Sequence, residues 1–130
     1  MDQEDREVQV KPAGSSLFRW SRKATPTLRS IDGSIKLARK ELAPDGDTLS
    51  SIGWRLGAAA AKALQWMEAN PCPDKISDSD IVDLLTTLAD TAASIDTAAQ
   101  AASPPDLKGF DSTLASVGTK VTELLATSSG

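Results

Sequence analysis

The chain has 130 residues, with 14 Lys and Arg against 18 Asp and Glu, no His and a single Cys. Its length predicts one domain, and an apolar fraction of 40% with only 4% aromatic residues predicts a core of aliphatic side chains and alanine. Without His, and with one Cys, the chain cannot build a zinc site of the usual Cys/His type, an internal disulfide, or a Ser-His-Asp or Cys-His catalytic pair.

The sequence is typical of a protein from a reducing compartment, because it has a single cysteine. The first five residues are mostly acidic, and no apolar run of signal-peptide length follows them. The most apolar stretch, residues 49–67, contains Arg55 and Lys62, so it does not predict a membrane span. We therefore expect a cytoplasmic protein.

Charge is distributed unevenly along the chain. Residues 1–10 carry a net charge of −3, residues 11–40 carry +7 and residues 41–130 carry −8. A basic segment attached to an acidic body has two interpretations: it lies on the chain's own acidic surface, or it binds an external anionic partner. The two interpretations stay open at the level of the sequence.

Residues 1–24 are predicted to form a flexible arm, because they are polar, contain Pro12 and Gly14 and show no sustained periodicity. The arm contains one cluster of aromatic and basic residues: Phe18, Arg19, Trp20, Arg22 and Lys23. Such a mixture can occupy a groove on a partner protein, stack on nucleic-acid bases or bind a membrane interface. The alternative is that the two aromatic side chains fold back and cover the end of the chain's own helical domain.

A helical domain is predicted over residues 25–130, with its first helix over residues 26–43. The apolar residues that repeat every three or four positions there are Leu28, Ile31, Ile35, Ala38 and Leu42. Thr25 is the expected N-cap, with Pro26 in the first turn and Pro44 after the end. The dipeptide Asp32-Gly33 is a strong turn signal, so a break near Gly33 is the alternative.

The second helix is predicted over residues 48–69, capped by Asp47, with its seam formed by Leu49, Ile52, Leu56, Ala59, Ala63 and Trp66. Beside that seam, Gly53, Trp54, Gly57 and Ala61 form a second apolar face, where small residues spaced by four allow another backbone to approach closely. Glycine costs about 1 kcal/mol in a helix interior relative to alanine, so a packing reason is expected. The favoured neighbour is a helix of the same chain, and the alternative is a second copy in a homodimer.

The third and fourth helices are predicted over residues 78–102 and 106–127. Ser77 with Asp80 resembles a capping box for the third helix, and Ile76 with Ile81 occupies the positions of a hydrophobic staple. The two seams comprise Leu85, Leu88, Ala92, Ile95, Ala99 and Ala102, and Leu107, Phe110, Leu114, Val117, Val121 and Leu124. Short connections make neighbouring helices antiparallel. The sequence thus predicts an all-α, up-down bundle of three long helices plus a shorter N-terminal helix.

One cysteine and one group of aspartates are the remaining candidates for chemical sites. Cys72 is interpreted as a passive loop thiol, because no His is present to activate it. Asp78, Asp80, Asp83 and Asp90 are interpreted as a solvated helix start, because a Ca²⁺ site needs a flexible oxygen cage containing glycine. No cofactor or metal is predicted.

These features favour a non-enzymatic protein-protein interaction module, an adaptor or regulatory bundle, that docks on another protein through its arm and, in the homodimer alternative, self-associates through its second helix. One alternative is a nucleic-acid or anionic membrane-surface binder acting through residues 11–40, although a body charge of −8 would repel phosphates. A second alternative is a small acidic inhibitor or immunity-type protein that offers its acidic surface to a basic target. An enzyme is the least favoured class.

Overall fold

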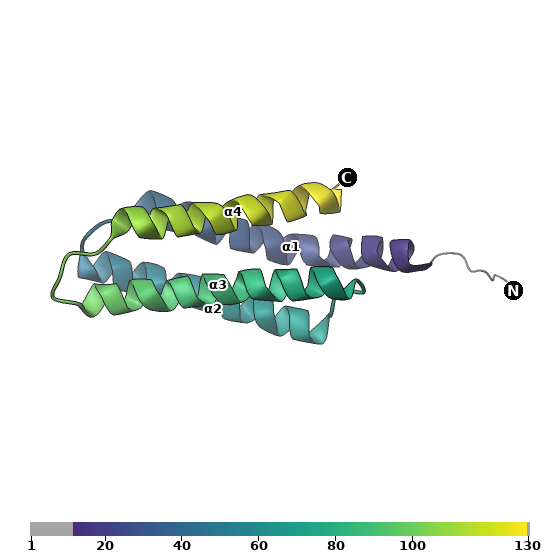
Figure 1. Ribbon diagram of the computed structural model, residues 1–130, viewed down its shortest axis with the longest axis horizontal. Coiled ribbons are helices and arrows are strands. Elements are labelled where there is room, and N and C mark those ends of the chain that lie inside the picture. Colours follow the sequence, from purple (N-terminus) through teal and green to yellow (C-terminus); the bar gives the residue numbers. More distant parts are fainter. Residues whose placement is uncertain (1–11, 130) are drawn as a thin grey trace, which may run out of the picture.

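Within residues 12–129, four helices run alternately up and down along the long axis of an elongated bundle (Figure 1). They are α1 (Pro12–Glu41), α2 (Gly46–Ala69), α3 (Lys75–Gln100) and α4 (Leu107–Ser129). The computed structural model describes the backbone of residues 12–129 and the side chains of residues 17–126. The prediction of an all-α antiparallel bundle is confirmed.

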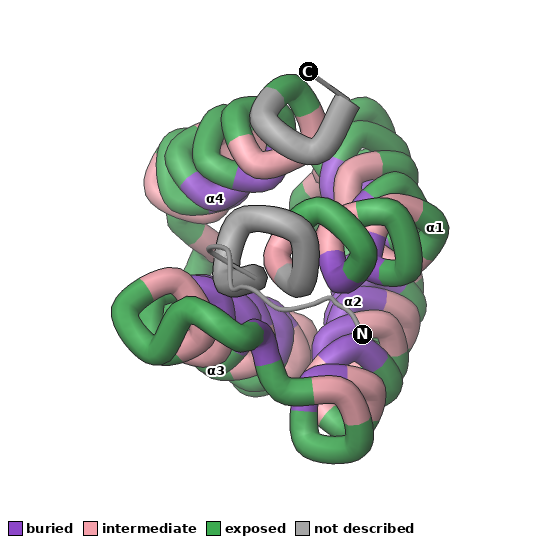
Figure 2. Tube along the Cα trace, turned by 90° about the vertical axis from the view of Figure 1, so that its right-hand side faces the viewer, coloured by how far each residue is buried: buried purple, intermediate pink, exposed green. Residues whose placement is uncertain are grey.

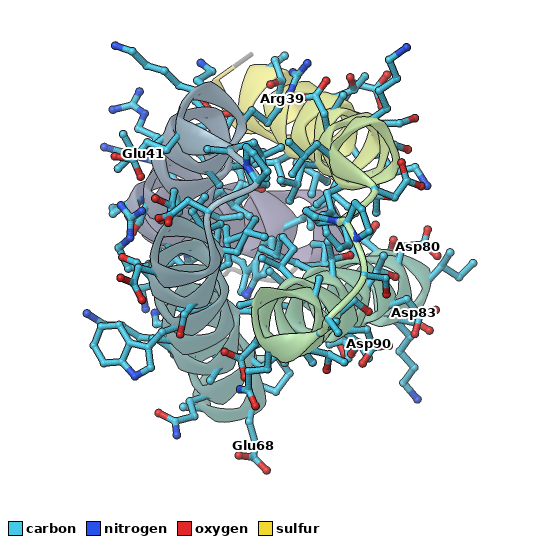
Figure 3. The ribbon with its side chains drawn as sticks, turned by 90° about the vertical axis from the view of Figure 1, so that its left-hand side faces the viewer. Arg39, Glu41, Glu68, Asp80, Asp83 and Asp90 are labelled. Carbon is cyan, nitrogen blue, oxygen red and sulfur yellow. The ribbon has the colours of Figure 1, made fainter. Side chains whose placement is uncertain are left out.

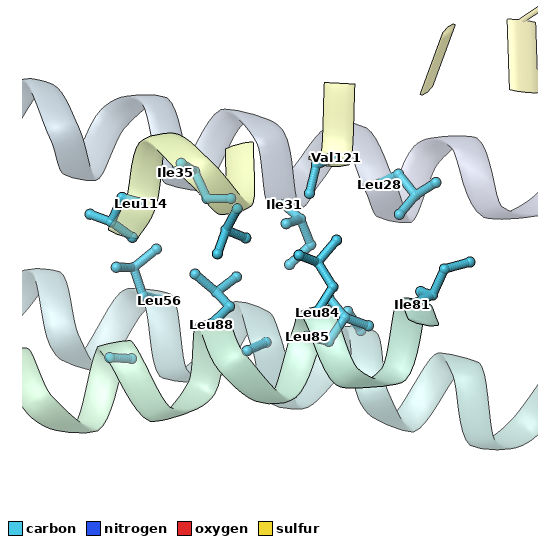
Figure 4. Close-up of a cluster of buried hydrophobic side chains, with 14 of the residues drawn as sticks. Leu28, Ile31, Ile35, Leu56, Ile81, Leu84, Leu85, Leu88, Leu114 and Val121 are labelled. Atoms are coloured by element: carbon cyan, nitrogen blue, oxygen red, sulfur yellow. The ribbon is translucent and has the colours of Figure 1, made fainter. Parts of the chain in front are cut away.

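The core lies along the axis of the bundle and takes side chains from every helix (Figures 2 and 4). Its largest fully buried members are Ile31, Ile35, Leu49, Ile52, Leu56, Leu85, Leu88, Ile95, Leu114 and Val121. All of them belong to the predicted seams. Each such side chain contributes about 1.5–3 kcal/mol when it is fully removed from water. The three-and-four spacing therefore identified the face that each helix buries.

The first helix starts earlier than predicted. It begins at Pro12 and has 30 residues, so it is the longest described helix and not the shorter one that we expected. Residues 12–24, which we assigned to the flexible arm, are helical, and residues 1–11 lie outside the described residues. Trp20 and Ala24 are buried and continue the face of Leu28 towards the N-terminus. Burial of these two side chains is the physical reason for the longer helix.

Thr25 and Pro26, which were expected at the start of the first helix, lie inside α1. Pro26 is exposed, so its ring meets no neighbouring helix, although it removes one backbone hydrogen bond. Thr25 is not a cap, and its hydroxyl donates to the Ser21 carbonyl at 2.8 Å. Gly33 faces solvent, and the helix passes through it without a break. Burial of the seam on either side overrides the turn signal.

Two helices begin earlier than predicted because each is capped by an earlier residue, α2 by Asp45 and not Asp47, and α3 by Asp74 and not Ser77. Asp45 caps α2 and accepts hydrogen bonds from the hydroxyl and the backbone N–H of Thr48, the latter at 2.9 Å. Asp74 caps α3 and accepts from the hydroxyl and the backbone N–H of Ser77, the latter at 3.1 Å. These bonds lower the pKa of both carboxyl groups. Ile76 is exposed, so the predicted staple does not form.

The contact between α2 and α3 is the most extensive helix pair of the bundle. It depends on Gly53, where a Cβ atom would lie 3.0 Å from the Ala92 carbonyl oxygen and 3.1 Å from the Asp96 backbone nitrogen. At Gly57 the corresponding Cβ would meet only the Ala92 Cβ, at an ordinary distance of 3.7 Å. The close approach of the two backbones therefore explains the first glycine and not the second.

Alanine at these two glycines is expected to have opposite effects on stability. Gly53→Ala should lower the free energy of unfolding by about 1–3 kcal/mol, because the new methyl group meets backbone atoms that cannot rotate away. Gly57→Ala should raise it by about 0.5–1 kcal/mol, because alanine favours the helix and fits the space. Urea unfolding of both variants, compared with the wild type, measures the two changes in the free energy of unfolding. Equal changes at the two positions would contradict the packing that we describe.

Candidate functional site

Trp20 is part of the core and does not project from an arm. Only 9% of its surface is exposed, and its indole N–H donates to the Asn70 carbonyl at 2.7 Å. Its ring centroid lies 5.8 Å from that of Trp66 in a tilted arrangement. The expectation that Trp20 is a partner-binding anchor is therefore not supported, because the chain itself covers the ring at the C-terminal end of α2.

Phe18 lies on the opposite side of the same helix and is 55% exposed. The Arg22 guanidinium carbon lies 5.8 Å from the centre of its ring, which is within cation–π range. Arg19 and Lys23 are exposed beside this pair. None of these three cations forms an ion pair within the part of the chain that the structure describes. We call Phe18, Arg19, Arg22 and Lys23 the Phe18 patch.

The basic face of α1 continues beyond the Phe18 patch. Lys36 pairs with Asp32 of its own helix at 2.9 Å, and Arg39 pairs with Asp111 of α4 at 2.8 Å. The hydrogen bond from Arg39 lowers the pKa of the Asp111 carboxyl group. α1 packs on α2 and α4, whereas the aspartate-rich α3 lies diagonally across the bundle (Figure 2). The basic segment is therefore only partly neutralised by the chain's own acids.

The residues expected to support self-association through α2 are not all on the surface. Gly53 is buried against α3 of the same chain, as described above. Trp54 is 74% exposed, Gly57 is half-buried and Ala61 is exposed. Trp54 and Gly57 line a shallow hollow of about 400 Å³ between α2 and α3, together with Ala58 and small residues of α3. This surface holds one large apolar side chain beside a recess.

A broad hollow lies between α3 and α4, and sequence reasoning did not identify it. It is a groove of about 820 Å³ between the first half of α3 and the middle of α4. Its apolar floor comprises Ile81, Leu84, Val117 and Leu124, and its sides carry aspartates and hydroxyl groups. Among the floor residues, Val117 and Leu124 belong to the predicted seam of the fourth helix, but the spacing of apolar residues does not encode how far apart the two helices lie. We call this feature the α3–α4 groove.

The acidic residues at the start of α3 do not act as one group. The Asp78 carboxylate accepts a hydrogen bond from the backbone N–H of Cys72 at 2.9 Å, which fixes the α2–α3 connection. Asp80, Asp83 and Asp90 lie on the outer side of α3 (Figure 3). They form no ion pair with any residue that the structure describes. The first two line the α3–α4 groove and the third does not.

Cys72 is buried in the connection between α2 and α3. Burial raises the pKa of its thiol. A raised pKa reduces the thiolate fraction at neutral pH, which is the opposite of what a nucleophilic cysteine requires. The local environment of Cys72 therefore favours the interpretation as a passive thiol.

No protein-family model matches the chain, and neither a curated protein nor a solved structure was found to match it. Within residues 12–129, no helix combines the length and the apolar character that a bilayer span requires. The function is therefore inferred from the surfaces described above.

Proposed function

We propose that the chain is a non-enzymatic protein-interaction module that docks on an acidic protein through the outer face of α1. The observation that carries this proposal is the Phe18 patch, an exposed aromatic ring surrounded by three cations that have no ion-pair partner within the described chain. Covering the ring with a partner would contribute about 1.5–3 kcal/mol. The cations would speed encounter with an acidic surface.

Trp20 supports the proposal because it fixes the helix that carries the patch. Its hydrogen bond to Asn70 and its contact with Trp66 hold this turn of α1 against α2. Side chains on a fixed helix lose less conformational freedom on binding than side chains on a flexible segment. The docking surface is thus a preformed helical face, and not the flexible arm that the sequence predicted.

A nucleic acid or an anionic membrane surface is the alternative partner for the same face. Arg29 and Lys40 are exposed farther along α1 and would extend a contact with a polyanion. Against it, the net charge of −4 disfavours a binder of phosphates. Self-association through α2 is a further candidate, and the observation that favours it is the exposure of Trp54.

A charge- and size-matched pair of variants tests the Phe18 patch. Phe18→Ala/Arg22→Ala removes one exposed apolar side chain and one cation from the patch, whereas Leu37→Ala/Lys40→Ala removes the same two kinds at the other end of α1. The probes are an acidic amphipathic peptide, vesicles of phosphatidylserine and phosphatidylcholine, and a DNA duplex. We expect the patch variant to bind the peptide at least about tenfold more weakly, an effect of about 1.4 kcal/mol, while the control retains its affinity.

Two results would contradict this proposal. Equal losses in the two variants would show that only the overall charge matters. Tighter binding of the duplex or the vesicles than of the peptide, with a steep loss between about 50 and 200 mM salt, would favour the polyanion alternative. Neither variant should change the thermal midpoint, because all four side chains are exposed.

A further inference from the structure

The α3–α4 groove differs from the other seams of the bundle. The α1–α4 seam is bridged by the ion pair of Arg39 and Asp111, and the α1–α2 seam by the ion pair of Arg55 and Glu41 and by the hydrogen bond of Trp20. In the α2–α3 seam the two backbones approach closely at Gly53, beside the shallow hollow of about 400 Å³. The contact between α3 and α4 is the least extensive of the packed helix pairs, and a hollow of about 820 Å³ lies between them. This seam has room for an additional element.

The lining of the groove is divided lengthwise into apolar and polar parts. Leu84 and Val117 form part of the floor, where they are buried at its base. The α4 side carries hydroxyl groups, including Ser116, and the α3 side carries Asp80 and Asp83. A surface of this kind matches an amphipathic helix that turns an apolar stripe to the floor and a polar stripe to one side.

The length of the groove fits about three helical turns. Its α3 side extends from Ser77 to Thr87 and its α4 side from Ser112 to Leu124. At 1.5 Å per residue, these stretches measure roughly 15 Å and 18 Å. Three turns accommodate anchor residues at positions i, i+3 or i+4, and i+7 of a docked helix.

Charge specifies the class of partner. α3 carries five Asp and one Lys, and Asp80, Asp83 and Asp90 lie unpaired, within the described chain, on its outer side (Figure 3). Lys120 is the one basic residue among the described residues that line the groove. We infer that the α3–α4 groove is a docking site for a basic amphipathic helix of a partner protein. Cationic side chains of that helix would lie against Asp80 and Asp83.

The chain itself does not supply a matching occupant. Residues 1–10 carry a net charge of −3, so the aspartates of the groove would repel them. The basic helix α1 already buries its apolar face in its own bundle, through Leu28, Ile31 and Ile35. A second folded copy could offer only the polar face of that helix. The groove and the Phe18 patch are on different helices, so this inference adds a second binding surface to the proposed module.

Binding of a synthetic peptide to the full chain tests the inference. The probe is a labelled peptide of about 18 residues, or five turns, with leucine on one face and lysine on the other. Its controls are a scrambled peptide of the same composition and a peptide with glutamate in place of lysine. We expect the amphipathic basic peptide to bind at least tenfold more tightly than either control, measured by fluorescence anisotropy.

Two pairs of variants with the same change in charge locate the site. Asp80→Asn/Asp83→Asn should weaken binding of the basic peptide about tenfold, whereas Asp90→Asn/Glu68→Gln should change it less than threefold, because neither of those acids lines the groove. Ser116→Trp should also weaken binding by filling the groove, while Phe18→Ala/Arg22→Ala should leave it unchanged. Thermal midpoints confirm that each variant is folded.

Three results would overturn the inference. Equal losses in the two charge-matched pairs would show general electrostatic attraction. Equal binding of the scrambled peptide would show that an apolar stripe is not required. Self-association that the Ser116→Trp variant abolishes, measured by sedimentation at several concentrations, would show that a second copy fills the groove. The Phe18→Ala/Arg22→Ala variant keeps the two proposals distinguishable, because it should lose the acidic peptide of the proposed function and retain the basic peptide of the groove.

Discussion

Replacing Trp20 with alanine is expected to lower the free energy of unfolding by about 3–5 kcal/mol, the usual cost of removing a buried aromatic side chain. The ring is 9% exposed, its N–H donates to the Asn70 carbonyl at 2.7 Å, and it packs on Trp66. Alanine removes all three interactions and leaves a cavity at this end of the bundle. Urea unfolding followed by far-ultraviolet circular dichroism measures the change.

Two further substitutions separate the contributions to this effect. Trp20→Phe keeps an aromatic ring but removes the N–H, so it should cost about 1–3 kcal/mol for the partly buried Asn70 carbonyl that loses its donor. Phe18→Ala should change stability by no more than about 0.5 kcal/mol, because that ring is exposed. A Trp20→Ala variant as stable as the wild type would mean that the segment around it does not pack on α2.

The geometry of a helix explains why the two aromatic residues have different roles. Phe18 and Trp20 are two positions apart, which corresponds to a rotation of about 200° around a helix. They cannot both face the bundle or both face solvent. From the sequence alone the two residues were expected to act as a single pair of anchors, because residues 1–24 were not predicted to be helical. Extending the seam backwards from Leu28 to Ala24 and Trp20 would have revealed the inward face.

The parts of the fold that depend on burial were predictable from the spacing of apolar residues. The seams identified the largest buried side chains, because a helix must turn its apolar face to the core. The helix starts were less predictable, because several polar residues near each start can act as a cap. Asp45 and Asp47 are both suitable by type, and only the backbone path shows that Asp45 faces the N–H of Thr48.

The candidate surfaces were predictable to different degrees. The cations of the Phe18 patch were identified from the local sequence, because several basic residues follow closely on an aromatic residue there. The α3–α4 groove was not identified from the sequence, since its existence depends on the distance between two helices. Periodicity identifies which face a helix buries but not how closely the next helix approaches. Small side chains along a seam, such as Ser112 and Ser116 of α4, are compatible with a tight contact as well as with a hollow.

Leu88→Ala and Leu114→Ala should each lower the free energy of unfolding by about 2–5 kcal/mol. Both side chains are fully buried, one on α3 and one on α4, and they lie in the same apolar cluster (Figure 4). Leu37→Ala is the matched control, because Leu37 is exposed and should change stability by no more than about 0.5 kcal/mol. A loss below about 0.5 kcal/mol at both buried positions would contradict the assignment of the core.

The same variants also test whether the four helices unfold as one unit. The tryptophans are all on α1 and α2, so their fluorescence reports those two helices, whereas circular dichroism reports all four. Because Ile35 of α1 and Leu114 of α4 belong to one buried cluster, loss of α4 would expose side chains of α1 as well. We therefore expect the two signals to change together in urea. The free energy of unfolding should fall with urea concentration at the same slope as in the wild type. If Leu114→Ala separates them, so that helix is lost before the fluorescence changes, then α4 opens independently along the α3–α4 groove.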